Sequence, residues 1–468
     1  MEIVEKKISL SLCEEPIPYA YEEAPVLTAE DYSKRIADMW AMPQNDDCDA
    51  IVVYGDREHY SNVYYYTGYD VRWEETLLIL VRNQKPVLIV GNEGIGYTKG
   101  LVSDLDIKMY QTFSLMGQPN DERSKTLSAY FAESGIKKGT KIGLIGWKVY
   151  RDDLFADGEL LTDIPYYIVR TLAALAGIEN LHNATDILTD CEYGQKHNVS
   201  AKEIIQFDLA GTKISRGIYN CIKNAKPGMT GRELAQFVGF DGQPGNMYPD
   251  IKIGHDVFKG ICGTQPLEKL EYGMHFSAGY GLRGSLVHHL GIYARSSADY
   301  PKDFDKYLEN FLKPYFASIV RWYEMMHIGT ECGDIYQIIA DELGMEKFNI
   351  SLNPGHLTHT DEWTNSPFFA GSKIKLSSGM ALQCDYTVKF QSPLVKAHIE
   401  DGLVLADENL REEIKKLSPT CWSRIETRQK FIRNVLNINL PAEVLPLSDL
   451  SCICFPYMAD TSIVLAKA

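Results

Sequence analysis

The chain has 468 residues, of which 45% are hydrophobic and 24% are charged. This composition is typical of a globular protein and excludes global disorder, and the length indicates roughly two to four domains. With 63 acidic against 47 basic residues, the formal charge is −16. Such a charge disfavours nucleic acids and anionic membranes as partners.

The first residues predict no leader segment. Lys6 and Lys7 are followed by only a short apolar stretch before Glu14. A secretory signal needs a longer apolar core, and a membrane-spanning helix needs about 18 consecutive apolar residues, which the sequence lacks. The ten cysteines are largely unclustered and indicate reduced thiols. We therefore expect a soluble, cytoplasmic protein.

Short apolar runs alternate with amphipathic stretches from about residue 28 to residue 180. The expected strands are bounded by Gly, Asp or Asn and cover residues 50–54, 76–81, 86–90 and 141–145. The expected helices cover residues 32–42, 124–134 and 165–175. This alternation predicts an α/β layer domain, and polar residues around 191–200 mark its boundary.

The following part of the chain contains an internal repeat. A long helix is expected over residues 201–225, because its apolar residues recur at helical spacing, and Pro227-Gly228 ends it. A shorter helix follows at 231–238, and the same series recurs at 307–326 and 334–343. Two pairs of segments match in sequence, namely 226–234 with 327–335 and 270–280 with 376–386. We expect two duplicated halves with a site between their matching strands.

The histidines are concentrated in this repeat. Eight of the eleven lie between residues 255 and 398. Histidines gathered in one segment indicate metal binding or acid–base chemistry. Scattered surface and capping histidines are the alternative.

Five motifs resemble those of the creatinase, aminopeptidase P, prolidase and methionine aminopeptidase superfamily. The motifs lie at residues 61–69, 226–234, 354–356, 379–385 and 399–401. The resemblance covers about residues 30–410 and implies the duplicated pita-bread fold. The expected organisation is an α/β N-terminal domain over 1–195, a duplicated α+β pita-bread domain over 200–410, and a C-terminal extension over 411–468 that packs on the body.

Metallopeptidases of this superfamily hold two metal ions with two Asp, one His and two Glu. In this sequence the first Asp position falls on Gly279, which has no side chain. The second falls on His289, with His288 the next choice. The family His falls on His356, and the two Glu positions fall on Asp385 and Glu400. The resemblance thus implies a single-metal site at most, with Zn, Mn or Fe held by His289, His356, Asp385 and Glu400.

A metal-free site is the alternative that the creatinases suggest, because they hydrolyse a C–N bond of a small molecule with a histidine as acid–base group. His356 is the first candidate for this role, with Asp385 and Glu400 binding a cation or tuning the imidazole. His289 and His359 are substitutes. The candidate substrate-binding residues are His59, His288, His359 and Tyr386.

We therefore expect a homodimeric hydrolase that acts on a C–N bond of a small amide, an amidino compound or a short peptide. It would need no cofactor or one divalent metal. A non-catalytic binding protein with the same fold is the second hypothesis, and a metal-dependent Xaa-Pro peptidase is the third. Purely structural interpretations also stand, with His288 and His289 in the core, Glu400 at an ion-paired strand end, and His59 in a turn.

Overall fold

A computed structural model describes residues 8–14, 23–150, 161–260, 263–264, 267–304, 306–350 and 352–468. The chain divides into two compact units, which we call the N-terminal unit (residues 26–195) and the C-terminal unit (residues 1–25 with 196–468). No helix among the described residues is long and apolar enough to cross a membrane.

The N-terminal unit is built on a six-stranded sheet with strand order β5-β4-β3-β2-β6-β7. Its strands are β2 (Ala50–Gly55), β3 (Thr76–Val81), β4 (Val87–Val90), β5 (Asp106–Met109), β6 (Ile142–Ile145) and β7 (Leu181–Asn183). Its α-helices are α2 (Ala29–Trp40), α3 (Ser61–Thr67), α4 (Gly94–Thr98), α5 (Leu127–Glu133), α6 (Tyr166–Ala176) and α7 (Asp186–Thr189). Val52 and Val53 belong to different hydrophobic clusters, so both faces of the sheet are covered. The predicted α/β domain is confirmed.

The C-terminal unit contains an eight-stranded sheet in which β11, β12, β14, β10, β9 and β8 follow one another. β13 and β15 also pair with β14. Its strands are β8 (Met247–Ile253), β9 (His275–Leu282), β10 (Ser285–Ile292), β11 (His356–Leu357), β12 (Ala381–Cys384), β13 (Val388–Gln391), β14 (Leu394–Leu405) and β15 (Val444–Pro446).

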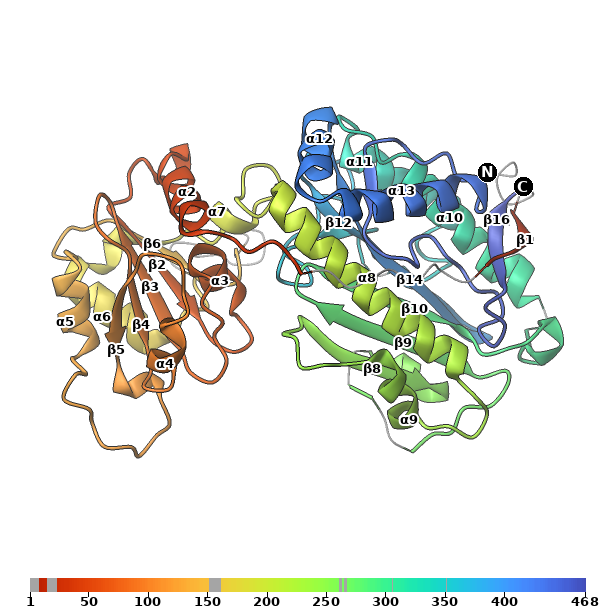
Figure 1. Cartoon of the computed structure of the whole chain (residues 1–468), viewed down its shortest axis with the longest axis horizontal. Coiled ribbons are helices and arrows are strands. Elements are labelled where there is room, and N and C mark those ends of the chain that lie inside the picture. The colour runs from red at the N-terminus through yellow and green to blue at the C-terminus, as the bar shows by residue number, and fades with distance from the viewer. Residues whose placement is uncertain are drawn as a thin grey trace. The chain divides into compact units, whose positions relative to one another are not determined.

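Long helices pack around this sheet (Figure 1). They are α8 (Ala201–Asn224), α10 (Lys313–Glu324), α11 (Cys332–Leu343), α12 (Glu408–Leu417) and α13 (Pro419–Asn434), with the short α9 (Gly231–Ala235). α8 packs on β9 and β10. It begins after Ser200, whose N–H donates to Glu203 Oε2 over 2.9 Å in a capping box.

Two matching turns confirm the predicted duplication. Gly228 follows α8 and Gly329 follows α10, and both adopt left-handed backbones with φ of 89° and 94°. Their N–H groups donate to the carbonyl oxygens of Leu270 over 2.8 Å and of Leu376 over 2.7 Å. A glycine is needed at each turn because other residues rarely adopt this backbone conformation. The C-terminal unit is therefore a duplicated α+β structure.

The two ends of the chain meet in the C-terminal unit. β1 (Ile8–Leu12) pairs antiparallel with β16 (Ile463–Lys467). β1 therefore groups with the C-terminal unit, whereas the sequence places these residues in a first domain over 1–195. Ile414 and Ile425 of the C-terminal extension share a hydrophobic cluster with Ile204 of α8, so the extension packs on the body of the unit.

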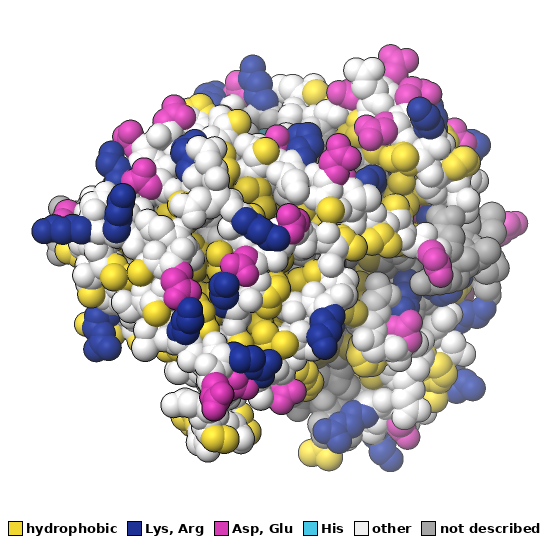
Figure 2. Space-filling view, turned by 60° about the vertical axis from the view of Figure 1, so that its left-hand side comes forward, with side chains coloured by type: hydrophobic (Ala, Val, Ile, Leu, Met, Phe, Trp, Pro, Cys, Tyr) yellow, Lys and Arg dark blue, Asp and Glu magenta, His cyan; other side chains and the backbone are white. Residues whose placement is uncertain are grey.

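Basic and acidic side chains are interspersed over the face of the molecule that Figure 2 shows. A nucleic-acid-binding surface has basic residues gathered in a patch or stripe. The visible face has a mixed pattern instead.

Candidate active site

A cavity of about 490 Å³ lies against the large sheet of the C-terminal unit and is lined by residues of β8, β9, β10 and β14. Successive side chains of a strand point to opposite faces, so residues two apart share a face. On β14 this alternation places Lys396, His398 and Glu400 on the cavity wall.

The pairing of β10 with β14 gathers two imidazoles and two carboxylates. His288 lies opposite Glu400 in the ladder, and the Nδ1 atoms of His288 and His398 share a hydrogen bond. The other nitrogen of His398, Nε2, lies 2.7 Å from Asp385 Oδ1 and 3.9 Å from Glu400 Oε2. One ring must donate and the other accept between the two Nδ1 atoms.

His356 adds a third imidazole, which is 7% exposed. Its Nδ1 lies 3.1 Å from the Leu357 carbonyl oxygen and donates to it, which fixes the orientation of the ring. Its Nε2 lies 3.3 Å from Glu362 Oε1, 3.5 Å from Asp385 Oδ2 and 3.8 Å from Glu400 Oε1. A single buried nitrogen therefore faces three carboxylates.

A glycine shapes the backbone directly before His356. Gly355 has φ of 115°, and a Cβ at this position would lie 2.7 Å from the Gln383 carbonyl oxygen. Only glycine accommodates both the backbone conformation and the close approach. The Pro354-Gly355-His356 motif thus has a local structural cause.

We call His288, His356, His398, Glu362, Asp385 and Glu400 the cluster. The pKa values of several of its side chains are shifted by burial and by their contacts with one another. Burial lowers the pKa of His356, but Glu362, Asp385 and Glu400 together raise it well above its ordinary value. Burial raises the pKa of Asp385, but its hydrogen bond with His398 and the neighbouring His356 imidazole outweigh this and lower it. Burial and the charge of Asp385 raise the pKa of Glu400. Glu400 is thus the carboxylate that accepts a proton most readily.

His288 has the opposite tendency to His356. Burial lowers its pKa well below the ordinary value, and the positive charges of His398, Lys252 and Lys396 lower it further. A neutral imidazole is the form that binds a metal ion.

Gly279 makes room for the His288 ring. It lies opposite His288 in the ladder of β9 and β10, and a Cβ there would lie 2.5 Å from His288 Cδ2. The side chain of β9 that contacts the ring is Ser277, whose Oγ lies 2.7 Å from His288 Nε2. The resemblance implies that a metal ligand has been lost at position 279. The His288 imidazole occupies the space that a side chain at this position would need.

His289 lies on the other face of β10. Its Nε2 is 3.2 Å from Asp401 Oδ2, and both side chains are buried. The structure thus does not bring the expected set of His289, His356, Asp385 and Glu400 together. His288 takes the position in the cluster that the sequence analysis gives to His289.

Three other expected residues also lie outside the cluster. His359 Nε2 is 3.1 Å from Glu203 Oε1 at the start of α8, and Tyr386 is fully buried in the core. His59 belongs to the N-terminal unit, where its Nδ1 lies 3.1 Å from Asp56 Oδ2.

The sequence analysis missed His398, Glu362, Ser277 and the lysines Lys252 and Lys396. His398 and Lys396 carry a usable signal, because they precede Glu400 by two and four residues on one strand. Glu362 lies outside the strands and helices, so no periodicity points to it.

Two groups of side chains among the described residues could hold a metal ion. One consists of His288, His398 and Glu400, and the other of His356, Glu362 and Glu400, with the ligand atoms of each group within 4.8 Å of one another. Imidazole and carboxylate ligands suit Zn, Mn and Fe. The two groups share Glu400.

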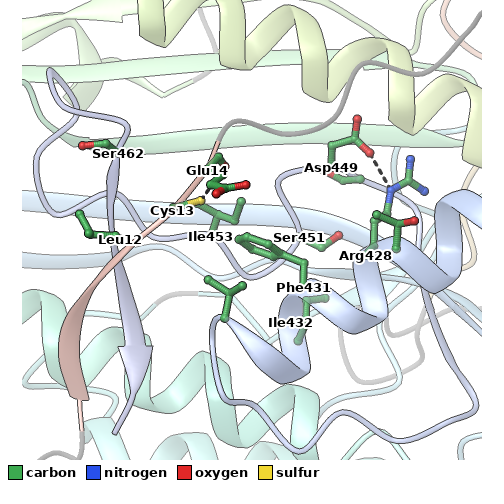
Figure 3. A pocket seen from close by; sticks show the side chains of 13 residues that line it. Leu12, Cys13, Glu14, Arg428, Phe431, Ile432, Asp449, Ser451, Ile453 and Ser462 are labelled. Atoms are coloured by element: carbon green, nitrogen blue, oxygen red, sulfur yellow. Dashed lines mark hydrogen bonds and ion pairs between the residues drawn. The ribbon is translucent and has the colours of Figure 1, made fainter.

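A second cavity, of about 630 Å³, lies between β1 and α13 (Figure 3). Leu12, Phe431 and Ile453 are among the apolar side chains of its wall. Arg428 Nε donates to Asp449 Oδ1 over 2.8 Å, and burial with the charge of Glu14 raises the pKa of the Cys13 thiol to about 11. The raised pKa disfavours a thiolate at Cys13, and the guanidinium already has a carboxylate partner.

The strand order, the duplicated turns and the cavity define a protein with the pita-bread fold, as the sequence motifs predict. No protein-family profile matches the sequence, and no curated protein matches it. Solved structures establish the fold. An Xaa-Pro dipeptidase from Bacillus anthracis matches with a TM-score of 0.59 and 12% identity, over 81% of this chain and 96% of the dipeptidase.

Two further solved structures match in the same way. An X-Pro aminopeptidase from Thermotoga maritima matches with a TM-score of 0.61 and 10% identity, over 80% of this chain and 95% of its own. A dipeptidase from Mycobacterium ulcerans matches with a TM-score of 0.59 and 16% identity, over 81% of this chain and 94% of its own. The shared feature is the two-part architecture of these peptidases.

Proposed function

We propose that the cavity is the active site of a hydrolase that cleaves a C–N bond of a small amide, an amidino compound or a short peptide. The observation that carries this proposal is the buried His356 Nε2, which faces Glu362, Asp385 and Glu400 within 3.3–3.8 Å. A histidine held in one orientation beside carboxylates of different pKa is the arrangement that general acid–base catalysis needs.

The proposed chemistry uses this pair of groups. His356 Nε2 donates its proton to the leaving nitrogen as the C–N bond breaks, and Glu400 takes a proton from the water that adds to the carbon. The proton then returns from Glu400 Oε1 to His356 Nε2, a distance of 3.8 Å. Asp385, whose pKa is lowered, stays ionised and holds the imidazolium of His356.

A single divalent metal fits the same residues. His356 Nε2 and Glu400 Oε1 are buried and have no hydrogen-bond partner in the described chain, and they converge with Glu362. These residues would hold one Zn, Mn or Fe ion, which would supply Lewis-acid activation of a carbonyl or of water.

Xaa-Pro dipeptides are the second candidate substrate class. The solved structures with this fold include an Xaa-Pro dipeptidase and an X-Pro aminopeptidase. At 12% and 10% identity, these names support a test of such peptides. We also propose that the protein is a cytoplasmic homodimer. Light scattering on the purified protein tests the dimer.

The test is turnover by the full chain of a panel of small amides, amidino compounds and dipeptides with and without proline. We expect one class to be hydrolysed, and the rate to fall about 10²–10⁴-fold in His356→Gln. His327→Gln is the control, because His327 is 57% exposed and pairs with Glu443. Equal rates in His356→Gln and the parent would refute the role of His356. Binding of panel members without turnover would favour the non-catalytic hypothesis.

Elemental analysis of the same samples determines the metal content. About one ion per chain would support the single-metal site. No metal in a protein that turns over substrate would support the metal-free route. Two ions per chain would contradict the ligand set given above.

A further inference from the structure

The cavity contains two lysines that the proposed chemistry does not use. Lys252 of β8 and Lys396 of β14 both line it, together with His288. The Lys252 side chain is 4% exposed, so its charge is withdrawn from bulk water.

The charges at this end of the cavity do not balance. Lys252 forms an ion pair with Asp250, a carboxylate that is 1% exposed. Lys396 Nζ donates to the Val257 carbonyl oxygen over 3.2 Å, and no carboxylate of the described chain forms an ion pair with it. An ammonium has three donors, so two remain for a ligand. The lysines and Asp250 together leave one net positive charge facing the cavity.

An unpaired amide accompanies these lysines. Asn246 lines the cavity, and its side-chain oxygen and nitrogen are both buried without a hydrogen-bond partner among the described residues. Buried polar groups are rarely left unpaired. An amide that can donate and accept suits a carboxylate with a neighbouring N–H group.

The geometry points to an anion-binding subsite, formed by Lys252, Lys396 and Asn246, that takes the carboxylate of a small substrate. A single net positive charge matches a monoanion better than a doubly charged phosphate. The cluster of Glu362, Asp385 and Glu400 repels a carboxylate, so the substrate has one orientation in the cavity. That the scissile bond then lies at His356 rests on the proposed function, whereas the subsite itself does not.

The test compares alanylglycine with alanylglycinamide, which lacks the carboxylate charge, in calorimetric titrations of the full chain. We expect the acid to bind about 10-fold more tightly than the amide, because hydrogen bonds to charged groups have this strength. The acidic protein as a whole favours the more positive amide, so a preference for the acid is specific to the subsite.

Two lysine variants locate the preference. Lys396→Met keeps the length of the side chain and should reduce the preference to about 2-fold or less, because it removes the unpaired charge. Lys389→Met is the matched control: it changes the net charge equally at a neighbouring strand, and Lys389 is not among the cavity-lining residues. Lys252→Met is avoided because it would leave Asp250 buried without its partner.

Four outcomes would overturn the subsite: acid and amide bind equally, neither binds, Lys396→Met keeps the preference, or Lys389→Met loses it as well. Inorganic phosphate that binds more tightly than alanylglycine would overturn the assignment to a carboxylate. If the acid is preferred but no panel substrate is turned over, the proposed function fails and the subsite stands. With a hydrolysed acidic substrate, we expect Lys396→Met to raise KM more than it lowers kcat.

Discussion

His288 and His289 are neighbours in the chain, but their side chains lie on opposite faces of the large sheet of the C-terminal unit. His288 shares a hydrogen bond with His398 on the cavity side, whereas His289 Nε2 lies 3.2 Å from the buried Asp401 on the opposite side. Because adjacent residues of a strand point to opposite faces, one of these histidines belongs to the site and the other to the core.

This separation predicts different effects of the same substitution. His289→Ala should lower the free energy of unfolding by about 1–3 kcal/mol, because it leaves the Asp401 carboxylate buried without its partner. His288→Ala should change stability less, since water in the cavity can replace its contacts, but should reduce turnover more. Urea unfolding and the rate per folded protein measure the two effects. Equal losses of both quantities in the two variants would contradict the assignment of faces.

The sequence predicts the fold better than it predicts the site. Gly228 and Gly329 repeat with their surroundings and thereby reveal the duplicated turns, because each turn has a local backbone requirement. The edge strands β5 and β7 are short, and the pairing of β1 with β16 joins the two ends of the chain. No local pattern specifies such contacts.

The site depends on register and on loop placement. Glu400, Asp385 and His356 are found from motifs, but the choice between His288 and His289 needs the pairing of β10 with β14. The alternation of side chains along a strand predicts which residues share a face. Which of the two faces borders the cavity depends on how the strand pairs with its neighbours.

Two of the three carboxylates around His356, Asp385 and Glu400, should respond differently to conversion into amides. The pKa of Asp385 is lowered, so its charged form stabilises the fold, and this contribution is lost as pH falls through the folded-state pKa. The pKa of Glu400 is raised, so ionising it destabilises the fold as pH rises above the ordinary value. At pH 7 we expect Asp385→Asn to destabilise by roughly 1–3 kcal/mol and Glu400→Gln to be neutral or stabilising.

Chelator-treated protein should be used for this comparison, because a bound cation changes the local charge balance. Urea unfolding at pH 7 of the parent and both variants gives the two differences. A Glu400→Gln variant destabilised as strongly as Asp385→Asn would contradict a raised pKa for Glu400.

His275 predicts a loss of stability in acid. It is 8% exposed, and its Nε2 accepts the Lys396 N–H over 3.1 Å. Burial, with the positive charges of Lys396 and His255, lowers its pKa to about 4. An unfolded histidine has a pKa of about 6.5. Between these values the unfolded chain binds more protons, so stability decreases as the pH decreases, by up to about 3 kcal/mol.

The variant His275→Gln tests this contribution, since glutamine can accept the same hydrogen bond and does not titrate. Urea midpoints at pH 7, 6 and 5 should fall less steeply for the variant than for the parent. The groups that face the ring are Lys396, His255 and Phe258, and they are unchanged in both proteins. Identical slopes would show that His275 is not the group that titrates.

The last prediction concerns the buried ion network between α8 and α13. Asp208 accepts from Arg424 Nε over 2.8 Å and from Arg428 Nη1 over 2.5 Å, and all three side chains are at most 4% exposed. Asp208→Asn leaves two buried guanidinium groups with too little negative charge, which should lower the free energy of unfolding by about 3–5 kcal/mol.

The control is Glu426→Gln, because Glu426 forms an exposed pair with Lys430 on α13. This variant should lose less than about 1 kcal/mol. Urea unfolding gives both values, and amide hydrogen exchange along α13 should accelerate only in Asp208→Asn. Similar small losses in the two variants would mean that the network orients α13 without stabilising it.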